Sequence, residues 1–223
     1  MIQINNLYFS YTKSAPFTLN NIDLTINNGE YISILGENGC GKSTLIKLIL
    51  NILYPTEGTI INSSKRIGYV PQKSDDFNSQ FPITVYEMLN CYRKILKIND
   101  KAIINKSLEM VNMLNFKNAL IGTLSGGQFQ KILITRALIG NPSLLILDEP
   151  STGVDINSQN DIYGFIKDLN KNHGITVISI EHNLDAAIRN STLIYHLRNG
   201  NGHLCTPTSY AKEYLKSNKK PIS

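Results

Sequence analysis

The chain has 223 residues, of which 42% are hydrophobic, and its 22 Lys and Arg against 17 Asp and Glu give a formal net charge of +5. This length fits one large domain, or one domain with an inserted lobe, and the apolar content is enough for a sizeable core. No run approaches the roughly 18 to 20 apolar residues that cross a membrane, and residues 1–5 lack the features of a signal peptide. We therefore expect a soluble, cytoplasmic protein.

The cysteines and the basic residues point to no particular ligand. Cys40, Cys91 and Cys205 are widely spaced and form neither a disulfide framework nor a zinc pattern, which fits a reducing compartment. The basic residues are spread along the chain without interleaved aromatic residues, so we interpret the charge as solvated surface and predict no nucleic-acid partner.

Residues 2–35 are predicted to be rich in β-strands, because their apolar residues fall near alternation. Asn27-Asn28-Gly29 predicts a hairpin turn into the next strand, residues 31–35. Tyr11 ends the first apolar run just before a polar loop. An aromatic ring there can stack on a nucleotide base, although by itself it is more often a packing residue.

Residues 36–44, GENGCGKST, match the phosphate-binding pattern G-x-x-x-x-G-K-[ST] without a mismatch. The apolar run before them predicts a buried strand, and the apolar periodicity after them predicts a helix. In that context backbone N–H groups can surround phosphate oxygens, and the helix N-terminus adds partial positive charge. The candidate residues for binding a nucleoside triphosphate are Gly36, Glu37, Asn38, Gly39, Cys40, Gly41, Lys42, Ser43 and Thr44.

Two members of this loop have distinct predicted roles. Lys42 can reach the terminal phosphates, and the Ser43 hydroxyl can bind Mg²⁺. The plain alternative for the whole stretch is a tight turn between a strand and a helix.

A change of pattern begins after two short predicted strands, residues 59–61 and 66–70. From Lys73 to Ile121 helical periodicity replaces the strand patterns, so residues 73–121 are predicted to form an inserted helical lobe. Thr84 and Glu87 have the spacing of a capping box at a helix start. We expect residues 1–72 and 122–205 to form the core and residues 206–223 a C-terminal tail.

Leu124-Ser125-Gly126-Gly127-Gln128 precedes a helical stretch, residues 129–139. A Ser-Gly-Gly turn that opens a helix exposes N–H donors and a hydroxyl, which predicts a second anion-binding site. As a lone pattern, it is equally an ordinary helix start.

Residues 144–150, LLILDEP, predict a buried parallel strand that ends in two carboxylates. Acids at such an end lie where open α/β sheets bind their ligands. Asp148 is placed to hold Mg²⁺, and Glu149 to polarise an attacking water, although solvated acids are the simple alternative. A second apolar strand, residues 175–180, ends at Glu181-His182, from which His182 could donate to a γ-phosphate.

Strands that alternate with helices predict an α/β fold with a doubly wound, mostly parallel sheet. A small antiparallel β-part precedes this sheet, and the helical lobe is inserted in it. With the phosphate loop, this architecture is that of a P-loop NTPase.

Taken in order, the motifs resemble those of the ATPase subunits of ATP-binding cassette (ABC) transporters over residues 1 to about 205. Residues 36–44 resemble the Walker A loop, and residues 144–149 resemble Walker B with its adjoining catalytic glutamate. Residues 124–128 resemble the LSGGQ signature, which separates this family from other P-loop proteins.

Four further positions carry the resemblance. Tyr11 resembles the adenine-stacking aromatic residue, and Gln72 resembles the glutamine that senses the γ-phosphate and Mg²⁺. Residues 151–155 resemble the dimer-contacting D-loop, and His182 the switch histidine.

The resemblance implies a mechanism with ATP and Mg²⁺. It assigns catalytic roles to Glu149, His182 and Gln72, and metal-binding roles to Ser43, Gln72 and Asp148. It also implies that two copies pair head to tail, with each ATP between Walker A of one and Ser125, Gly126, Gly127 and Gln128 of the other.

The resemblance also implies membrane partners. Integral membrane permease subunits would dock on the helical lobe, and a solute-binding protein would take part indirectly. The chain would then lie at the inner face of the membrane.

The transported solute is suggested by similarity alone. Residues 81–85, FPITV, and 152–159, TGVDINSQ, resemble stretches in ATPases of zinc and manganese importers. A siderophore or another small solute is the alternative. LSGGQ-type ATPases that act on DNA or ribosomes are a further one, but no long coiled coil separates Walker A from the signature.

Some residues depart from common family usage, namely Lys131, Glu181 and Asn183. None of them removes a catalytic group, so we expect an active enzyme. His196, His203 and Cys205 fit no standard zinc spacing, and a C-terminal hairpin explains them. Cys40 is most simply a space-filling residue, with inhibition by thiol oxidation as a side hypothesis.

Overall fold

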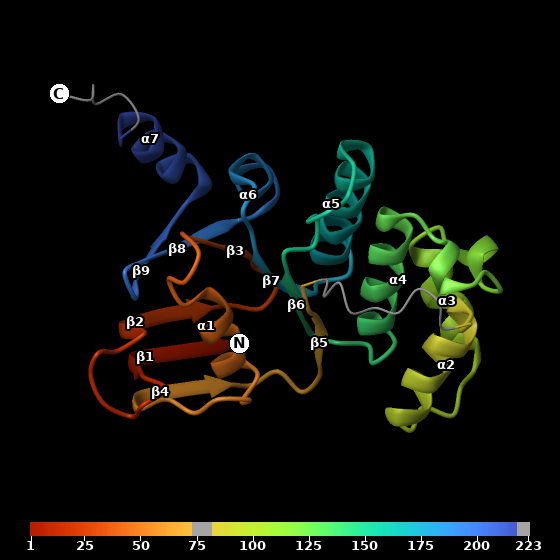
Figure 1. Cartoon of the computed structure of the whole chain (residues 1–223), viewed down its shortest axis with the longest axis horizontal. Helices are drawn as coiled ribbons and strands as arrows, with labels where there is room; N and C mark the ends of the chain where they lie inside the picture. Colours follow the sequence, from red (N-terminus) through yellow and green to blue (C-terminus); the bar gives the residue numbers. More distant parts are fainter. Residues whose placement is uncertain (73–81, 218–223) are drawn as a thin grey trace. The chain divides into compact units, whose positions relative to one another are not determined.

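The structure is a computed structural model that describes residues 1–72 and 82–217, with side chains described to residue 213. The chain divides into two compact units (Figure 1). Unit 1 comprises Met1–Ser64 and Thr176–Ser223, and unit 2 comprises Lys65–Ile175. Within the described residues, no helix is long and apolar enough to cross a membrane.

Unit 1 holds an antiparallel sheet, strands of a mostly parallel sheet and several helices. Its elements are β1 (Ile2–Phe9), β2 (Leu19–Ile26), β3 (Tyr31–Leu35), α1 (Lys42–Ile49), β4 (Glu57–Asn62), β7 (Thr176–Ile180), α6 (Leu184–Asn190), β8 (Leu193–Arg198), β9 (Asn201–Cys205) and α7 (Pro207–Ser217).

The antiparallel sheet has the strand order β2-β1-β4. Ile4 pairs with Leu24 of β2 and with Ile60 of β4. The apolar residues of β1 alternate with polar ones because one face of the strand is buried, as the sequence pattern predicted.

The predicted hairpin at residues 27–29 is wrong. Strand β2 pairs with β1, whereas β3 pairs with β7 and β8 in the other sheet. The turn therefore passes the chain from one sheet to the other. It is held by the carboxylate of Glu30, which accepts a 2.8 Å hydrogen bond from the backbone N–H of Asn27.

In the mostly parallel sheet of unit 1, β3 lies between β7 and β8, and β9 adds antiparallel to β8. Every residue of β3 and β7 is buried, which explains why both strands have near-continuous apolar sequences. Leu35, Ala187 and Ile194 pack in one cluster with Leu184 and Tyr210, so α6 and α7 cover one face of β3 and β8.

Unit 2 holds a pair of parallel strands and the main helices of the molecule. Its elements are β5 (Ile67–Val70), α2 (Val85–Ile95), α3 (Ala102–Met110), two 3₁₀ turns, η1 (Leu114–Phe116) and η2 (Ile121–Thr123), α4 (Gly126–Leu138), β6 (Leu144–Asp148) and α5 (Ile156–Lys171). Strand β5 pairs with β6 in parallel.

Helices α2, α3 and α4 pack around a common core that includes Leu89, Ile104, Leu108 and Ile132. The predicted capping box is present, because Thr84 and Glu87 exchange backbone and side-chain hydrogen bonds. Residues 85–121 contain the helices α2 and α3 and the 3₁₀ turn η1, which fits the helical periodicity of the sequence, whereas the bounds of the lobe stay a prediction. Residues 73–81, the first part of the predicted lobe, lie outside the described residues.

The pairs β3–β7, β3–β8 and β5–β6 are all parallel, and helices separate the strands in the sequence. The α/β class with a mostly parallel sheet and a separate N-terminal antiparallel sheet is thus confirmed.

Candidate functional site

The phosphate loop runs from β3 into α1, as predicted. Helix α1 begins at Lys42, and Gly41 before it adopts a positive φ of 106°. Gly41 has no side chain to cap the first turn, so that turn can offer its N–H groups to an anion.

The Lys42 side chain closes the loop on itself. Its ammonium donates to the backbone carbonyls of Gly36, at 2.7 Å, and Glu37, at 2.9 Å. Lys42 is only 6% exposed, and a buried cation needs such partners. A phosphate in the loop would offer this ammonium a full negative charge in addition to the two carbonyls.

Gly36 occupies a position with no room for a side chain. A Cβ atom there would lie 2.3 Å from the carbonyl oxygen of Leu197 and 2.6 Å from the sulfur of Cys40. The start of the loop therefore packs directly on β8, which fixes its backbone. Cys40 fills the remaining space, in agreement with the simpler interpretation of that residue.

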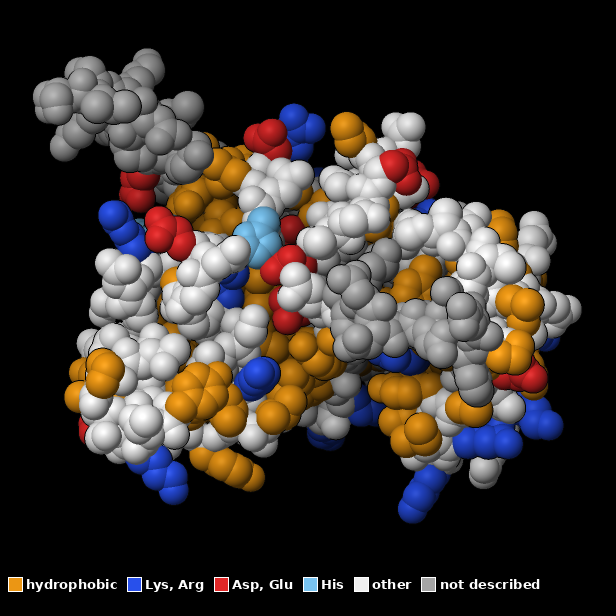
Figure 2. Space-filling view, in the orientation of Figure 1, with side chains coloured by type: hydrophobic (Ala, Val, Ile, Leu, Met, Phe, Trp, Pro, Cys, Tyr) orange, Lys and Arg blue, Asp and Glu red, His pale blue; other side chains and the backbone are white. Residues whose placement is uncertain are grey.

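Tyr11 is tied to the start of α1. Its hydroxyl lies 3.0 Å from the Thr44 hydroxyl, and its ring packs edge-on against Phe9 at 4.9 Å. Tyr11 is 61% exposed, beside a cavity of about 590 Å³ that Ile52 and Tyr54 also line. Apolar side chains are exposed on this part of unit 1, as Figure 2 shows. The geometry leaves a flat apolar surface open to a ring-shaped ligand.

His182 and the phosphate loop line the same cavity in unit 1. This cavity has a volume of about 520 Å³, and Gly36, Glu37 and Cys40 form part of its wall. The structure thus brings together two motifs that lie some 140 residues apart in the sequence.

The residues on either side of His182 have local structural roles. Glu181 is 2% exposed, and its carboxylate accepts a hydrogen bond from the Ser179 hydroxyl. Asn183 caps α6 by accepting a 3.1 Å hydrogen bond from the backbone N–H of Ala186. Members of the family that the motifs resemble frequently have Asp at this position, and Asn and Asp are about equally good caps, so the substitution keeps the cap.

In unit 2, β6 ends at Asp148, which is 7% exposed. Tyr69 on the neighbouring strand β5 is hydrogen-bonded to this carboxylate. Partial burial raises the pKa of Tyr69, and the negative charge of Asp148 and the hydrogen bond to it raise the pKa further. The tyrosine therefore stays protonated and donates at neutral pH.

Tyr69 was not among the predicted site residues. The register of the parallel pair β5–β6, in which Tyr69 is opposite Ile146, places it near the end of β6. No local motif in the sequence marks this contact.

Glu149 lies just beyond β6 and has a positive φ of 52°, a conformation that non-glycine residues seldom adopt. Its Oε2 accepts a 2.8 Å hydrogen bond from Nε2 of Gln72 and a 3.0 Å hydrogen bond from the Thr152 hydroxyl. The structure thus brings together two predicted residues, Gln72 and Glu149. It adds Thr152, which the sequence predicted as part of the dimer-contacting loop but not as a partner of Glu149. An unusual backbone conformation held by side-chain contacts is typical of functional positions.

The signature turn, residues 125–128, begins α4. Ser125 caps the helix by accepting from the backbone N–H of Gln128 at 3.2 Å, and the Gln128 side chain accepts from the Ser125 N–H at 2.9 Å. Because of this reciprocal cap, the helix begins at Gly126 rather than at the predicted residue 129. That the signature turn is a second anion-binding site stays a prediction.

The loop of residues 151–155 is fastened to α5. Nε2 of Gln159 donates to the carbonyls of Ser151, at 3.2 Å, and Val154, at 2.8 Å. Tyr163 donates a buried 2.8 Å hydrogen bond to the Ser151 hydroxyl. The loop is therefore held at both ends by the helix that follows it.

The predicted C-terminal hairpin is formed by β8 and β9, in which His196 pairs with His203 and Ile194 with Cys205. Within the described residues, no three His, Cys, Asp or Glu side chains converge in the manner of metal ligands. The hairpin accounts for the positions of the three residues.

A glycine loop between a buried strand and a helix, closed over a buried lysine, defines a P-loop nucleotide-binding protein. Residues 19–152 match the profile of the family described as "ABC transporter". The chain therefore belongs to the ABC transporter family, and it is an ATP-binding and ATP-hydrolysing cassette of that family.

Two curated relatives align over most of the chain. A protein of Treponema pallidum (strain Nichols), named as a probable metal transport system ATP-binding protein, is 52% identical over 98% of this chain and 92% of its own length. The high-affinity zinc uptake system ATP-binding protein of Bacillus subtilis (strain 168) is 41% identical over 82% of this chain and 84% of its own length.

Two solved structures share the fold. One, described as a metal-chelate type ABC transporter in an inward-facing conformation, has a TM-score of 0.84 and 28% identity, and covers 93% of this chain and 84% of its own. The other is a dimeric ATP-binding cassette bound to ADP and phosphate in a post-hydrolysis state. It has a TM-score of 0.76 and 26% identity, and covers 93% of this chain and 99% of its own.

Proposed function

We propose that this chain is the ATPase subunit of an importer of a divalent metal ion, zinc or manganese. The 52% identity to the metal transport protein, over nearly the whole of both chains, carries this proposal. The zinc uptake relative of B. subtilis supports it at 41% identity. An ATPase subunit does not touch the solute, so similarity rather than site geometry indicates the substrate.

ATP is the proposed nucleotide, with residues 36–44 around its phosphates and Tyr11 against its base. The buried ammonium of Lys42 and the uncapped first turn of α1 support the phosphate assignment. The exposed ring of Tyr11 beside an apolar cavity supports the base assignment.

Mg²⁺ is the proposed cofactor, held by Ser43, Gln72 and Asp148. A hydroxyl, an amide oxygen and a carboxylate are oxygen ligands of the kind that Mg²⁺ binds. Gln72 donates through its amide nitrogen to Glu149, which leaves its amide oxygen for a cation, so the donor set fits. When bound, Mg²⁺ would neutralise charge that develops on the transferred phosphoryl group.

Glu149 is the proposed group that orients and polarises the attacking water, and Gln72 holds that carboxylate in place. His182 is the proposed hydrogen-bond donor to the γ-phosphate, a role that its place in the cavity beside Gly36 and Glu37 supports. These groups act by position and electrostatics, which is how phosphoryl transfer is generally catalysed.

A second copy of the chain is the proposed partner at the signature turn. Ser125, Gly126, Gly127 and Gln128 would face the ATP held by the other copy, in a head-to-tail dimer. The dimeric cassette with ADP and phosphate supports this arrangement. ATP would then favour the closed dimer because it binds that state more tightly, and ADP would favour the open state for the same reason.

Permease subunits in the membrane are the proposed partners of the helical part of unit 2, and a solute-binding protein would act with them. The chain would then work on the cytoplasmic face of the membrane. The relatives that are named as ATP-binding proteins of transport and uptake systems support this placement.

Transport measurements test the proposal. In a strain that lacks the gene, we expect the wild-type chain to restore uptake of radioactive zinc or manganese, and Glu149→Gln to restore none. If the wild-type chain restores uptake of neither metal, the proposed substrate is wrong.

A ferric siderophore is the second candidate, and the structural likeness to the metal-chelate type transporter favours it. The same strains supplied with a labelled ferric siderophore decide between the two. Uptake of the siderophore but not of zinc or manganese would establish the second candidate in place of the first.

A further inference from the structure

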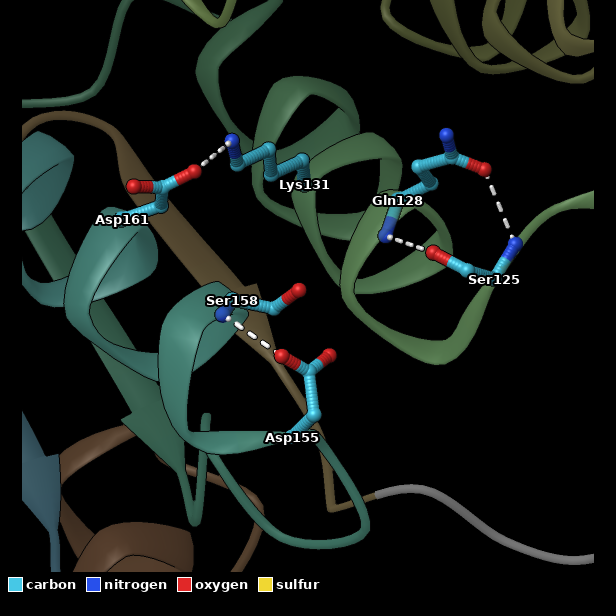
Figure 3. A network of polar contacts seen from close by, with 6 residues as sticks. All are labelled: Ser125, Gln128, Lys131, Asp155, Ser158 and Asp161. Carbon is cyan, nitrogen blue, oxygen red and sulfur yellow. Dashed lines mark hydrogen bonds and ion pairs between the residues drawn. The ribbon is translucent and has the colours of Figure 1, made fainter.

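The start of α4 rests directly on the start of α5. A Cβ atom added to Gly127 would lie 2.5 Å from Cβ and 2.7 Å from Oγ of Ser158, and 3.4 Å from a methyl group of Val154. Real Cβ contacts are not that short, so the two helix starts are as close as a glycine permits. Figure 3 shows Ser158 on the first turn of α5, with its side chain directed towards α4.

The first turn of α5 is itself fixed to the loop before it. Asp155 caps the helix by accepting a 3.0 Å hydrogen bond from the Ser158 N–H (Figure 3). Gln159 holds the carbonyls of Ser151 and Val154 from the same turn. A displacement of the loop therefore moves Ser158 with it.

One turn further along, Lys131 of α4 and Asp161 of α5 form an ion pair at 3.3 Å (Figure 3). The two side chains are 20% and 69% exposed, and exposed pairs contribute little energy. The pair therefore lies beside the contact of Gly127 with Ser158 without contributing much to it, and that packing contact sets the separation of the two helices.

We propose that Ser158 is a positioning residue for the signature turn: it acts through its contact with Gly127 and fixes where residues 125–128 present their N–H groups. The inference rests on the proposed function, in which that turn binds the ATP of a second copy. In consequence the signature turn and the loop of residues 151–155 move as one piece. Thr152 in the same loop contacts Glu149, so this piece also reaches the carboxylate.

The test uses chains that carry Glu149→Gln, in which the proposed function predicts a stable dimer with ATP. Gly127→Ala should weaken ATP-driven dimerisation about tenfold or more, because its methyl group displaces the turn. Binding of a fluorescent ATP analogue to dilute monomer should be unchanged. Adding Ser158→Gly removes the opposing Cβ and should restore most of the lost dimerisation.

The outcomes separate the inference from the proposed function. Dimerisation of Glu149→Gln with ATP upholds the proposed function. If Gly127→Ala then has no effect, or if Ser158→Gly fails to rescue it, the positioning role of Ser158 is overturned. If the Glu149→Gln parent forms no dimer with ATP, the proposed function and the inference that rests on it both fail.

A second variant leaves the signature turn unaltered. Ser158→Leu should push α4 away and weaken dimerisation about tenfold, whereas Ser158→Ala, which keeps the same Cβ, should not. Asn160→Leu places the same leucine side chain at an exposed position of α5 and is the matched control. Thermal unfolding of each chain shows whether it is folded. Equal dimerisation of Ser158→Leu and Asn160→Leu would overturn the inference.

Discussion

The amide nitrogen of Gln72 donates a 2.8 Å hydrogen bond to Oε2 of Glu149, across 77 positions of sequence. The hydroxyl of Thr152 donates to the same oxygen at 3.0 Å. Two neutral donors on one carboxylate oxygen limit the rotation of the carboxylate. The carboxylate is thus held in one orientation by two side chains, of which Gln72 lies far before Glu149 in the sequence and Thr152 shortly after it.

Glu149→Gln tests the proposed base. The amide has the size of the carboxylate but cannot accept a proton from water, so we expect hydrolysis to fall by about two orders of magnitude or more. ATP binding should persist, and an ATP-bound dimer should accumulate in size-exclusion chromatography. Hydrolysis at the wild-type rate would show that another group activates the water.

Thr152→Val tests the second donor to the carboxylate. Valine keeps the branched shape of threonine and removes the hydroxyl, so we expect kcat to fall about tenfold because a hydrogen bond to a charged group is lost. Thr152→Ser keeps the hydroxyl and serves as the control. An equal loss in both variants would point to loop packing instead of the hydrogen bond.

Contiguous motifs and their local structure could be predicted from the sequence. The phosphate loop, the cap at Thr84 and the acidic end of β6 all depend on neighbours within a few residues, and the structure has all three. The turn at residues 27–29 could not be predicted correctly, because an Asn-Asn-Gly turn fits both a hairpin and a change of sheet. Only the pairing of β3 with β7 and β8 decides between them.

Contacts between distant residues could not be predicted in the same way. Tyr69 reaches Asp148 because β5 and β6 pair in one particular register, which no local pattern records. Gly127 could be recognised as part of the signature, but the contact that explains its lack of a side chain is with Ser158 on another helix. Such contacts depend on packing across the fold, and sequence spacing does not encode them.

Tyr69→Phe tests the contact with Asp148. Loss of the phenolic hydrogen bond lets the carboxylate turn away, so we expect roughly tenfold more Mg²⁺ for half-maximal ATPase activity. Activity at saturating Mg²⁺ should be close to that of the wild type. Tyr195→Phe removes a buried tyrosine hydroxyl that donates to the backbone carbonyl of Asp23, and it should leave the Mg²⁺ requirement unchanged. A similar requirement in wild type and Tyr69→Phe would refute this role.

His196 predicts how stability depends on pH. Burial lowers its pKa from the usual value near 6.5, and the positive charges of Arg198 and His203 lower it further, against the opposing charges of Glu213 and Glu37. The unfolded chain therefore takes up the proton at a higher pH than the folded chain does. Above about pH 6.5 the histidine is neutral in both states and has no effect; as the pH falls through that value, the folded state loses stability until His196 itself is protonated.

We therefore expect the urea midpoint of the wild-type chain to fall between pH 7.5 and pH 5.5 by more than that of His196→Phe. Phenylalanine keeps an aromatic ring for the edge-on contact with Tyr210, 5.3 Å between centroids, and removes the titrating group. His173→Asn removes an exposed histidine instead and controls for the loss of a histidine elsewhere. Equal pH dependence in wild type and His196→Phe would mean that other groups cause the loss at low pH. If His196→Phe, but not His173→Asn, shows a smaller pH dependence than the wild type, the loss of stability at low pH comes from His196, at the contact between β8 and α7.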